Sequence, residues 1–125
     1  MLALFLAVAL DLKSFEATED AYLRHGRADL MLDLANRMLE RPNDPNAAAY
    51  LHARGLAYSQ MHLPRPAWQA FEQALPIAER SGDLNVIAEI HRDRAIWIWR
   101  FRRDRAAALK EFDQAIDCGT RAHAW

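Results

Sequence analysis

The sequence predicts an all-α protein, and three features of its composition lead to that prediction. The chain has 125 residues, of which 24 are Ala and 16 are Leu, both strong helix formers. The β-branched residues Val, Ile and Thr number only 2, 6 and 2. Gly and Pro contribute four and five residues, too few for a many-turned β-structure. The apolar fraction of 52% is sufficient for a packed core in one domain covering residues 1–125.

Clusters of helix-breaking residues divide the chain into six expected helices. These clusters lie at residues 25–26, 42–46, 64–66, 81–83 and 118–120. The helices expected between them cover residues 2–25, with an alternative break near 11–14, and residues 27–41, 46–62, 66–81, 84–102 and 105–118. The connections are short, and short loops favour antiparallel neighbours.

The first expected helix begins with a run that is apolar from Met1 to Leu10. The run lacks the basic residues and the cleavage site of a signal peptide. It is also about half as long as the ~20 residues that cross a bilayer, so we expect no membrane association. The sequence favours a helix buried by neighbours on several sides. If nothing in the chain covers it, we expect this helix to form a contact between copies in a homo-oligomer or to be the cut edge of a larger protein.

Specific residues mark the boundaries of the later helices. Gly82 can adopt the left-handed conformation that ends a helix, and Asp83 can then cap the following one. Pro66 fits the first turn of a helix, where a missing N–H is tolerated. These boundaries support separate helices over residues 66–81 and 84–102.

A pattern of small and aromatic residues recurs along the chain. Small residues let two helices approach closely, while aromatic side chains fill the space between them. The first copy of the pattern comprises Gly55, Tyr58, Ala67, Phe71 and Ala74. The second copy lies 41 residues further on and comprises Trp99, Ala108, Phe112 and Ala115. A weaker copy precedes both, with Ala21 and Tyr22 at the positions of Ala57 and Tyr58.

This pattern resembles the tetratricopeptide repeat (TPR), a helix pair of about 34 residues. A displacement of 41 is longer by two helical turns and is similar to the long repeats of bacterial transcriptional regulators and signalling proteins. The resemblance implies antiparallel helix pairs stacked as a right-handed superhelix, an α-α solenoid. Its units would be a degenerate pair at 1–41 and repeats at 46–81 and 84–118. Solenoid ends need polar covers, so we expect a fragment of a larger protein or a homo-oligomer.

The resemblance further implies a groove lined by the first helix of each pair. In the two clear repeats its residues would be His52, Leu56, Ser59, Gln60, Asp93, Trp97, Arg100 and Phe101. In the degenerate pair they would be Glu16, Asp20, Leu23 and Arg24. Trp97 and Phe101 beside Arg100 suit a peptide with an apolar anchor and an acidic group. The expected function is a non-enzymatic module that binds a protein or peptide, within a regulatory or signalling protein.

A nucleic-acid-binding module that uses residues 92–105 is the alternative function. Residues 90–105 contain six Arg, two Trp and one Phe, a mixture that can bind phosphates and stack bases. On a helix, however, these arginines are dispersed around the axis, with acidic residues close enough to pair with several of them. The formal net charge of -1 also argues against nucleic acid as the partner of this module.

The sequence contains no pattern that indicates catalysis. The five histidines are scattered without a metal-ligand spacing, and no phosphate-binding loop or nucleophile motif is present. The single cysteine, Cys118, fits a small core residue and excludes an internal disulfide, which is typical of a reducing, cytoplasmic compartment. We therefore expect neither enzyme activity nor a metal or other cofactor.

Overall fold

The computed structural model describes residues 11–123, and every regular element in that range is helical. In chain order these elements are α2 (Leu12–Arg24), α3 (Ala28–Leu39), α4 (Ala47–Gln60), α5 (Pro64–Ser81), α6 (Leu84–Trp97), the π-helical segment η1 (Ile98–Arg102) and α7 (Arg105–Ala122). The prediction of an all-α protein is therefore confirmed for these residues. The apolar run at residues 1–10 lies outside the described residues.

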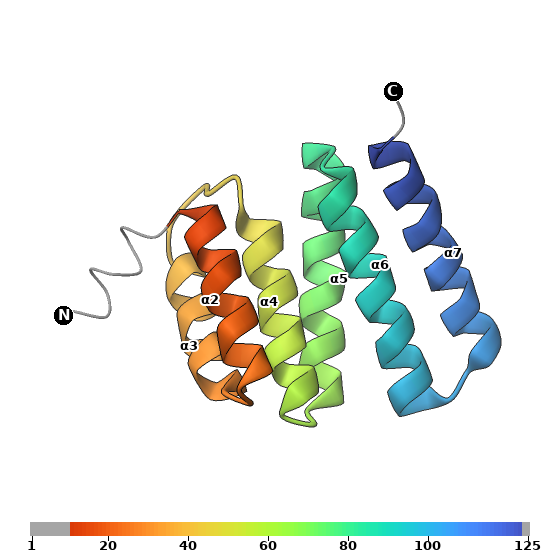
Figure 1. The fold of residues 1–125 in the computed structure, drawn as a ribbon, viewed down its shortest axis with the longest axis horizontal. Helices are drawn as coiled ribbons and strands as arrows, with labels where there is room; N and C mark the ends of the chain where they lie inside the picture. The colour runs from red at the N-terminus through yellow and green to blue at the C-terminus, as the bar shows by residue number, and fades with distance from the viewer. Residues whose placement is uncertain (1–10, 124–125) are drawn as a thin grey trace.

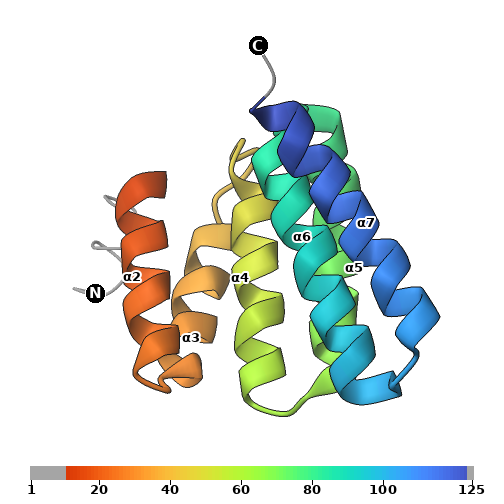
Figure 2. The ribbon, with the colours of Figure 1, turned by 45° about the vertical axis from the view of Figure 1, so that its right-hand side comes forward.

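From one end to the other the helices follow chain order and run alternately down and up, with α3 and α5 set behind the row that α2, α4 and α6 form (Figure 1). Each helix contacts the next one in the chain, and α4 additionally contacts both α2 and α6. These three alternate helices thus neighbour one another along one side of the row. Helices α2 and α7 lie at opposite ends, an order that is also visible after a 45° turn (Figure 2).

The predicted boundary between α5 and α6 is confirmed. Gly82 has a φ of 74°, in the left-handed region, and ends α5. The Asp83 side chain then accepts hydrogen bonds from the backbone N–H groups of Asn85 and Val86, at 3.1 and 3.3 Å. Helix α5 begins at Pro64, two residues earlier than expected, because Pro is tolerated at the first positions of a helix.

The predictions for the last two helices were wrong in two places. The expected helix at 84–102 divides at residue 98, where the chain widens into η1 and the Arg103 N–H donates to the Ile98 carbonyl at 2.9 Å. The expected break at 118–120 is absent, since α7 continues through Gly119 to Ala122. A single Gly costs a helix only about 1 kcal/mol. Burial of Cys118 among the neighbouring helices compensates for this cost.

Alanine dominates the interior between the helices. Among residues 11–123, 21 apolar residues are buried and 11 of them are Ala, so the helices are in contact through small side chains and approach closely. One cluster around Phe15, Met31 and Tyr50 joins α2, α3 and α4. A second cluster, which includes Ile90 and Cys118, joins α4, α5, α6 and α7.

The residues expected to pack within the helix pairs differ in how deeply they are buried. Gly55, Ala67, Phe71, Ala74 and Ala108 are buried, whereas Tyr58, Phe112 and Ala115 are half-buried. The Phe71 ring lies directly on Gly55: a Cβ added to this glycine would be 2.7 Å from Cδ1 and 2.9 Å from Cζ of that ring. The close approach of α4 and α5 therefore depends on the missing side chain at position 55.

Trp99 does not fill the interior of its helix pair as expected. Its side chain is 47% exposed at the edge of α7, beside Ala108 and Phe112. The π-helical turn of η1 changes the angular position of the residues that follow α6, and Ile98 is the buried residue there. The 41-residue displacement of the repeat pattern predicts Trp99 at the position that Tyr58 occupies in the preceding pair.

Candidate functional site

A groove runs between α4 and α6 and extends along η1. We call it the α4–α6 groove, and its lining residues are Leu23, Leu56, Ser59, Gln60, His62, Phe71, Asp93, Ile96, Trp97, Arg100 and Phe101. It brings together seven of the eight residues that the resemblance assigned to a groove in the two clear repeats. The eighth, His52, lies in an adjoining hollow.

That hollow opens toward α2, and we call it the α2 hollow. Its lining residues are Glu19, Asp20, Leu23, Arg24, His52, Leu56, Glu89 and Arg92. Leu23 and Leu56 line both depressions, so the groove and the hollow adjoin along one surface. Of the residues expected from the degenerate pair, Glu16 is not in the lining of either depression, whereas the other three are.

Aromatic side chains form one end of the α4–α6 groove. The Trp97 ring lies between Trp68, at a centroid distance of 4.7 Å, and Phe101, at 5.5 Å. Its indole Nε1 donates a hydrogen bond of 2.8 Å to the carbonyl oxygen of Pro64. This bond fixes the ring orientation, so the aromatic surface at this end is preorganised for an apolar group.

Arg100 provides the cationic group beside these rings. Its side chain donates to the carbonyl oxygen of Ser59 at 3.3 Å and to Nδ1 of His62 at 3.1 Å. The guanidinium also lies 5.1 Å from the centroid of the Phe101 ring. The side chain is exposed, and a guanidinium has five N–H donors, so donors are left to bind a carboxylate.

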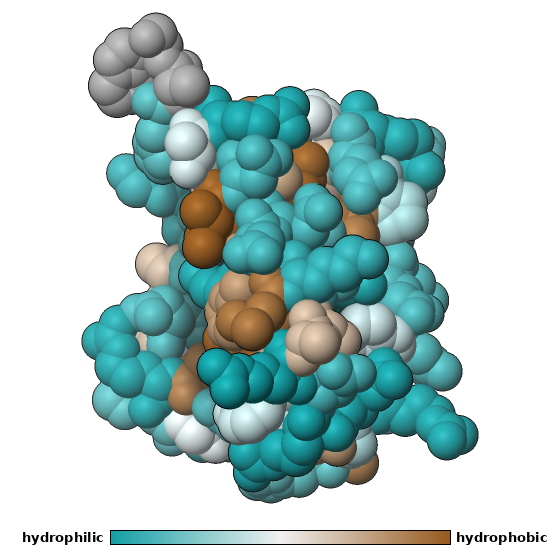
Figure 3. Space-filling model, turned by 90° about the vertical axis from the view of Figure 1, so that its right-hand side faces the viewer, coloured by the Kyte–Doolittle hydropathy of each residue, from teal (hydrophilic) through white to brown (hydrophobic). Residues whose placement is uncertain are grey.

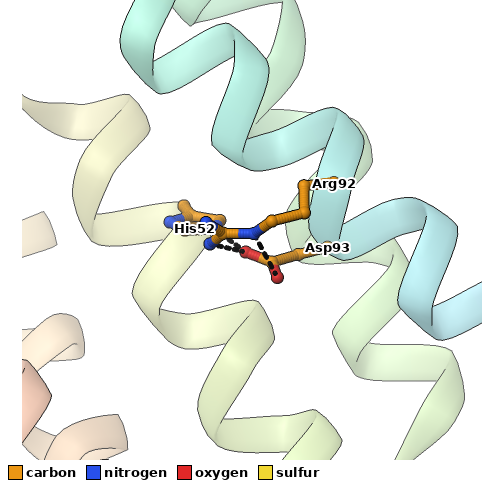
Figure 4. A network of polar contacts seen from close by, with 3 residues as sticks. All are labelled: His52, Arg92 and Asp93. Atoms are coloured by element: carbon orange, nitrogen blue, oxygen red, sulfur yellow. Dashed lines mark hydrogen bonds and ion pairs between the residues drawn. The ribbon is translucent and has the colours of Figure 1, made fainter. Parts of the chain in front are cut away.

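His52 and Asp93 form a buried pair that joins α4 to α6 (Figure 4). His52 Nε2 lies 2.5 Å from Asp93 Oδ2, and Arg92 donates to the two carboxylate oxygens at 3.3 and 3.1 Å. Burial raises the pKa of the Asp93 carboxyl, but the hydrogen bonds from His52 and Arg92 outweigh it and hold the pKa below its ordinary value of 3.8. An ionised carboxylate only accepts, so His52 Nε2 carries the proton.

The sequence placed His52 and Asp93 among the residues that contact a ligand. In the structure both are buried, and their polar atoms bind each other, with Arg92 covering the carboxylate (Figure 4). The pair therefore links α4 to α6 beneath the groove.

Glu19 is a member of the α2 hollow that sequence reasoning missed. Burial raises the pKa of its carboxyl to about 7; the nearby His52 opposes this shift, while Glu89 and Glu16 add to it. Its Oε2 atom is buried without a hydrogen-bond partner among the described residues. The sequence could have indicated this position, because Glu19 lies three residues after Glu16 and four before Leu23. On a helix this spacing places all three residues on the same face.

The raised pKa of Glu19 makes stability depend on pH. Because the folded pKa lies above the ordinary value of 4.5, the folded state favours the protonated acid. The free energy of unfolding should therefore decrease as the pH rises from about 4.5 to about 7. Glu19→Gln should remove this decrease and stabilise the protein by on the order of 2 kcal/mol near pH 8. Urea unfolding monitored by circular dichroism, at several pH values, measures the effect.

The matched control is Glu79→Gln, which removes an exposed carboxylate from α5. This variant should keep the wild-type pH profile, because an exposed carboxylate contributes little to stability. Identical pH profiles for Glu19→Gln and wild type would contradict the assignment of the buried acid.

The arginines of the segment 92–105 are distributed over several contacts. Besides Arg92 and Arg100, Arg94 lies 3.2 Å from Oε1 of Glu111 and 4.7 Å from the centroid of a Trp68 ring. Arg103 lies over Trp99, at 5.2 Å. Four of the six arginines therefore contact other groups of the chain, on different sides of α6 and η1.

Neither a metal-binding cluster nor a membrane-crossing helix is found within residues 11–123. No group of three or more His, Cys, Asp or Glu side chains is arranged there to hold a metal ion. None of the helices there combines the length and apolar composition that a bilayer span requires. No family model, curated protein or solved structure matches the chain.

Proposed function

We propose that the chain is a TPR-like module of the long-repeat type, which binds a peptide segment of another protein and catalyses no reaction. In this proposal the helix pairs form a right-handed α-α solenoid, and the peptide lies in the α4–α6 groove. The module would serve as the binding part of a regulatory or signalling protein. The observation that carries the proposal is the α4–α6 groove, with a fixed aromatic end and an exposed guanidinium.

Contacts between equivalent positions support the repeat architecture. The hydrogen bond between His52 and Asp93 joins residues that are 41 positions apart. The hydrogen bond from Arg100 to Ser59 spans the same separation. This is also the displacement at which the pattern of small and aromatic residues recurs. Stacked repeats bring equivalent positions of neighbouring units together, so two such contacts between α4 and the α6–η1 segment favour a repeated unit.

The groove chemistry supports a partner with an apolar side chain and a carboxylate. The apolar side chain would pack on Trp97 and Phe101, where burial of aromatic surface supplies much of the binding free energy. The carboxylate would bind the guanidinium of Arg100, which is already oriented by Ser59 and His62. Because these groups are held in place before binding, little conformational entropy is lost on association.

A random peptide library displayed on phage tests this proposal. The selected peptides should combine an aromatic or aliphatic residue with Asp or Glu a few positions away. The best peptide is then synthesised with a fluorescent label, and its dissociation constant is measured by anisotropy. Arg100→Glu should weaken binding by at least tenfold, since it replaces a charge-assisted hydrogen bond by repulsion.

Arg102→Glu is the matched control, because Arg102 is exposed on the same segment and does not line the groove. It makes the same charge change and should alter the dissociation constant less than about twofold. Equal losses in both variants, or none in either, would contradict the groove. A labelled single-stranded oligonucleotide serves as a second probe. Salt-dependent binding that both variants reduce would favour the nucleic-acid alternative.

A further inference from the structure

The outer face of α7, at one end of the row, is apolar and exposed. Ile116 is 65% exposed and Leu109 is 51% exposed, and their separation of two helical turns places them on the same face. Trp99, Ala108 and Phe112 form a shallow hollow with Leu109 and with Arg105 at its edge. Viewed from this end, several apolar patches lie exposed between polar side chains (Figure 3). Large exposed apolar side chains grouped on one face indicate an interaction site.

The opposite end of the row lacks a comparable surface. In α2 and α3, the large apolar side chain that is exposed is Leu30, at 37%. The chain that leads into α2, residues 1–10, is nevertheless apolar at all ten positions. It joins the described structure at Asp11, the N-cap of α2. An apolar segment and an apolar surface are therefore attached to opposite ends of the same row (Figure 1).

We propose that residues 1–10 of one copy bind the outer face of α7 in a second copy, so that the chain associates head to tail. The segment carries no charge, which suits a surface centred on Leu109 and Ile116. Within one copy, α3, α4, α5 and α6 separate α2 from α7 in chain order. Association removes the apolar segment and the α7 face from water together. The two contact surfaces differ, so the interface is heterologous.

A mixing experiment with two full-length variants tests this arrangement. One variant carries Leu109→Glu and Ile116→Glu, and the other carries Leu4→Glu and Leu6→Glu. Wild type should show a mass that rises with concentration in sedimentation velocity, while each variant alone should be monomeric, with self-association at least tenfold weaker. The first variant keeps an intact segment and the second an intact face. Their mixture should therefore form a heterodimer of one chain each, which grows no further.

Several outcomes would overturn the proposal. One is a wild type that stays monomeric at every concentration. Another is self-association that survives in the Leu109→Glu, Ile116→Glu variant. Continued dimerisation of the Leu4→Glu, Leu6→Glu variant would indicate α7-to-α7 pairing instead. Circular dichroism verifies that each variant is folded. Met61→Glu is the control: Met61 is 40% exposed at the end of α4, away from α7, and its change should leave association unaltered.

Discussion

Replacement of Asp93 by Ala is expected to lower the free energy of unfolding by about 1–3 kcal/mol, the cost of leaving a buried donor without its acceptor. The change leaves the buried N–H of His52 and the guanidinium of Arg92 without their acceptor, and it breaks the bond between α4 and α6. Chemical unfolding at about pH 7, monitored by far-UV circular dichroism, measures the loss.

Two further variants separate the pair from its surroundings. Asp33→Ala removes a carboxylate that pairs with Arg37 on an exposed helical face, and it should cost less than about 1 kcal/mol. The double replacement of His52 and Asp93 by Leu should recover much of the loss, since a matched apolar pair leaves no buried charge. Equal effects of Asp33→Ala and Asp93→Ala would show that the buried pair contributes no more to the free energy of unfolding than an exposed ion pair does.

The Asp93 contribution also has a defined pH dependence. Its folded pKa lies below the ordinary value of 3.8, so the contribution is fully present above about pH 4. It is lost as the pH falls through the folded pKa, because protonation removes the acceptor. Wild type should therefore be destabilised by acid in this range, and Asp93→Ala should lack that component. Glu19 acts in the opposite direction and at higher pH, so the two carboxyl groups can be distinguished.

The elements that the sequence predicted well are those set by local residue patterns. The caps at Gly82 and Asp83 depend on backbone conformations that few residues adopt, and both are found as expected. Phe71 of α5 lies on Gly55 of α4, because the missing side chain at position 55 leaves room for a ring where the two helices approach closely. Seven of the eight residues that the TPR resemblance assigned to a groove line one depression.

The features that the sequence did not predict depend on contacts between distant residues. Helix α7 crosses Gly119 because the burial of Cys118 offsets a small local cost. Trp99 lies exposed within the π-helical turn, and no residue pattern provides a signal for that turn. His52 and Asp93 were each placed on the groove face, but their mutual bond requires the spacing between α4 and α6. Periodicity gives the face of a helix and not the distance to its neighbour.

Gly55→Ala tests how closely α4 and α5 approach each other. The change should destabilise the protein by about 1–3 kcal/mol, although Ala is the better helix former. The added methyl group would lie within 3.0 Å of three atoms of the Phe71 ring, so the ring or a helix must move. Phe71 is buried, and its ring also neighbours that of His52 at a centroid distance of 6.0 Å. A shift of the ring would therefore disturb the buried pair as well.

Gly119→Ala is the matched control, because this glycine also lies inside a helix and a Cβ there would meet nothing within 4 Å. The control should stabilise the protein by about 0.5–1 kcal/mol through helix propensity alone. The difference between the two variants then isolates the overlap at Phe71. Phe71→Leu in the Gly55→Ala background should make the methyl group less costly, with a coupling free energy above about 0.5 kcal/mol. If both alanines stabilised the protein, α4 and α5 would lie too far apart for the Phe71 ring to contact position 55 closely.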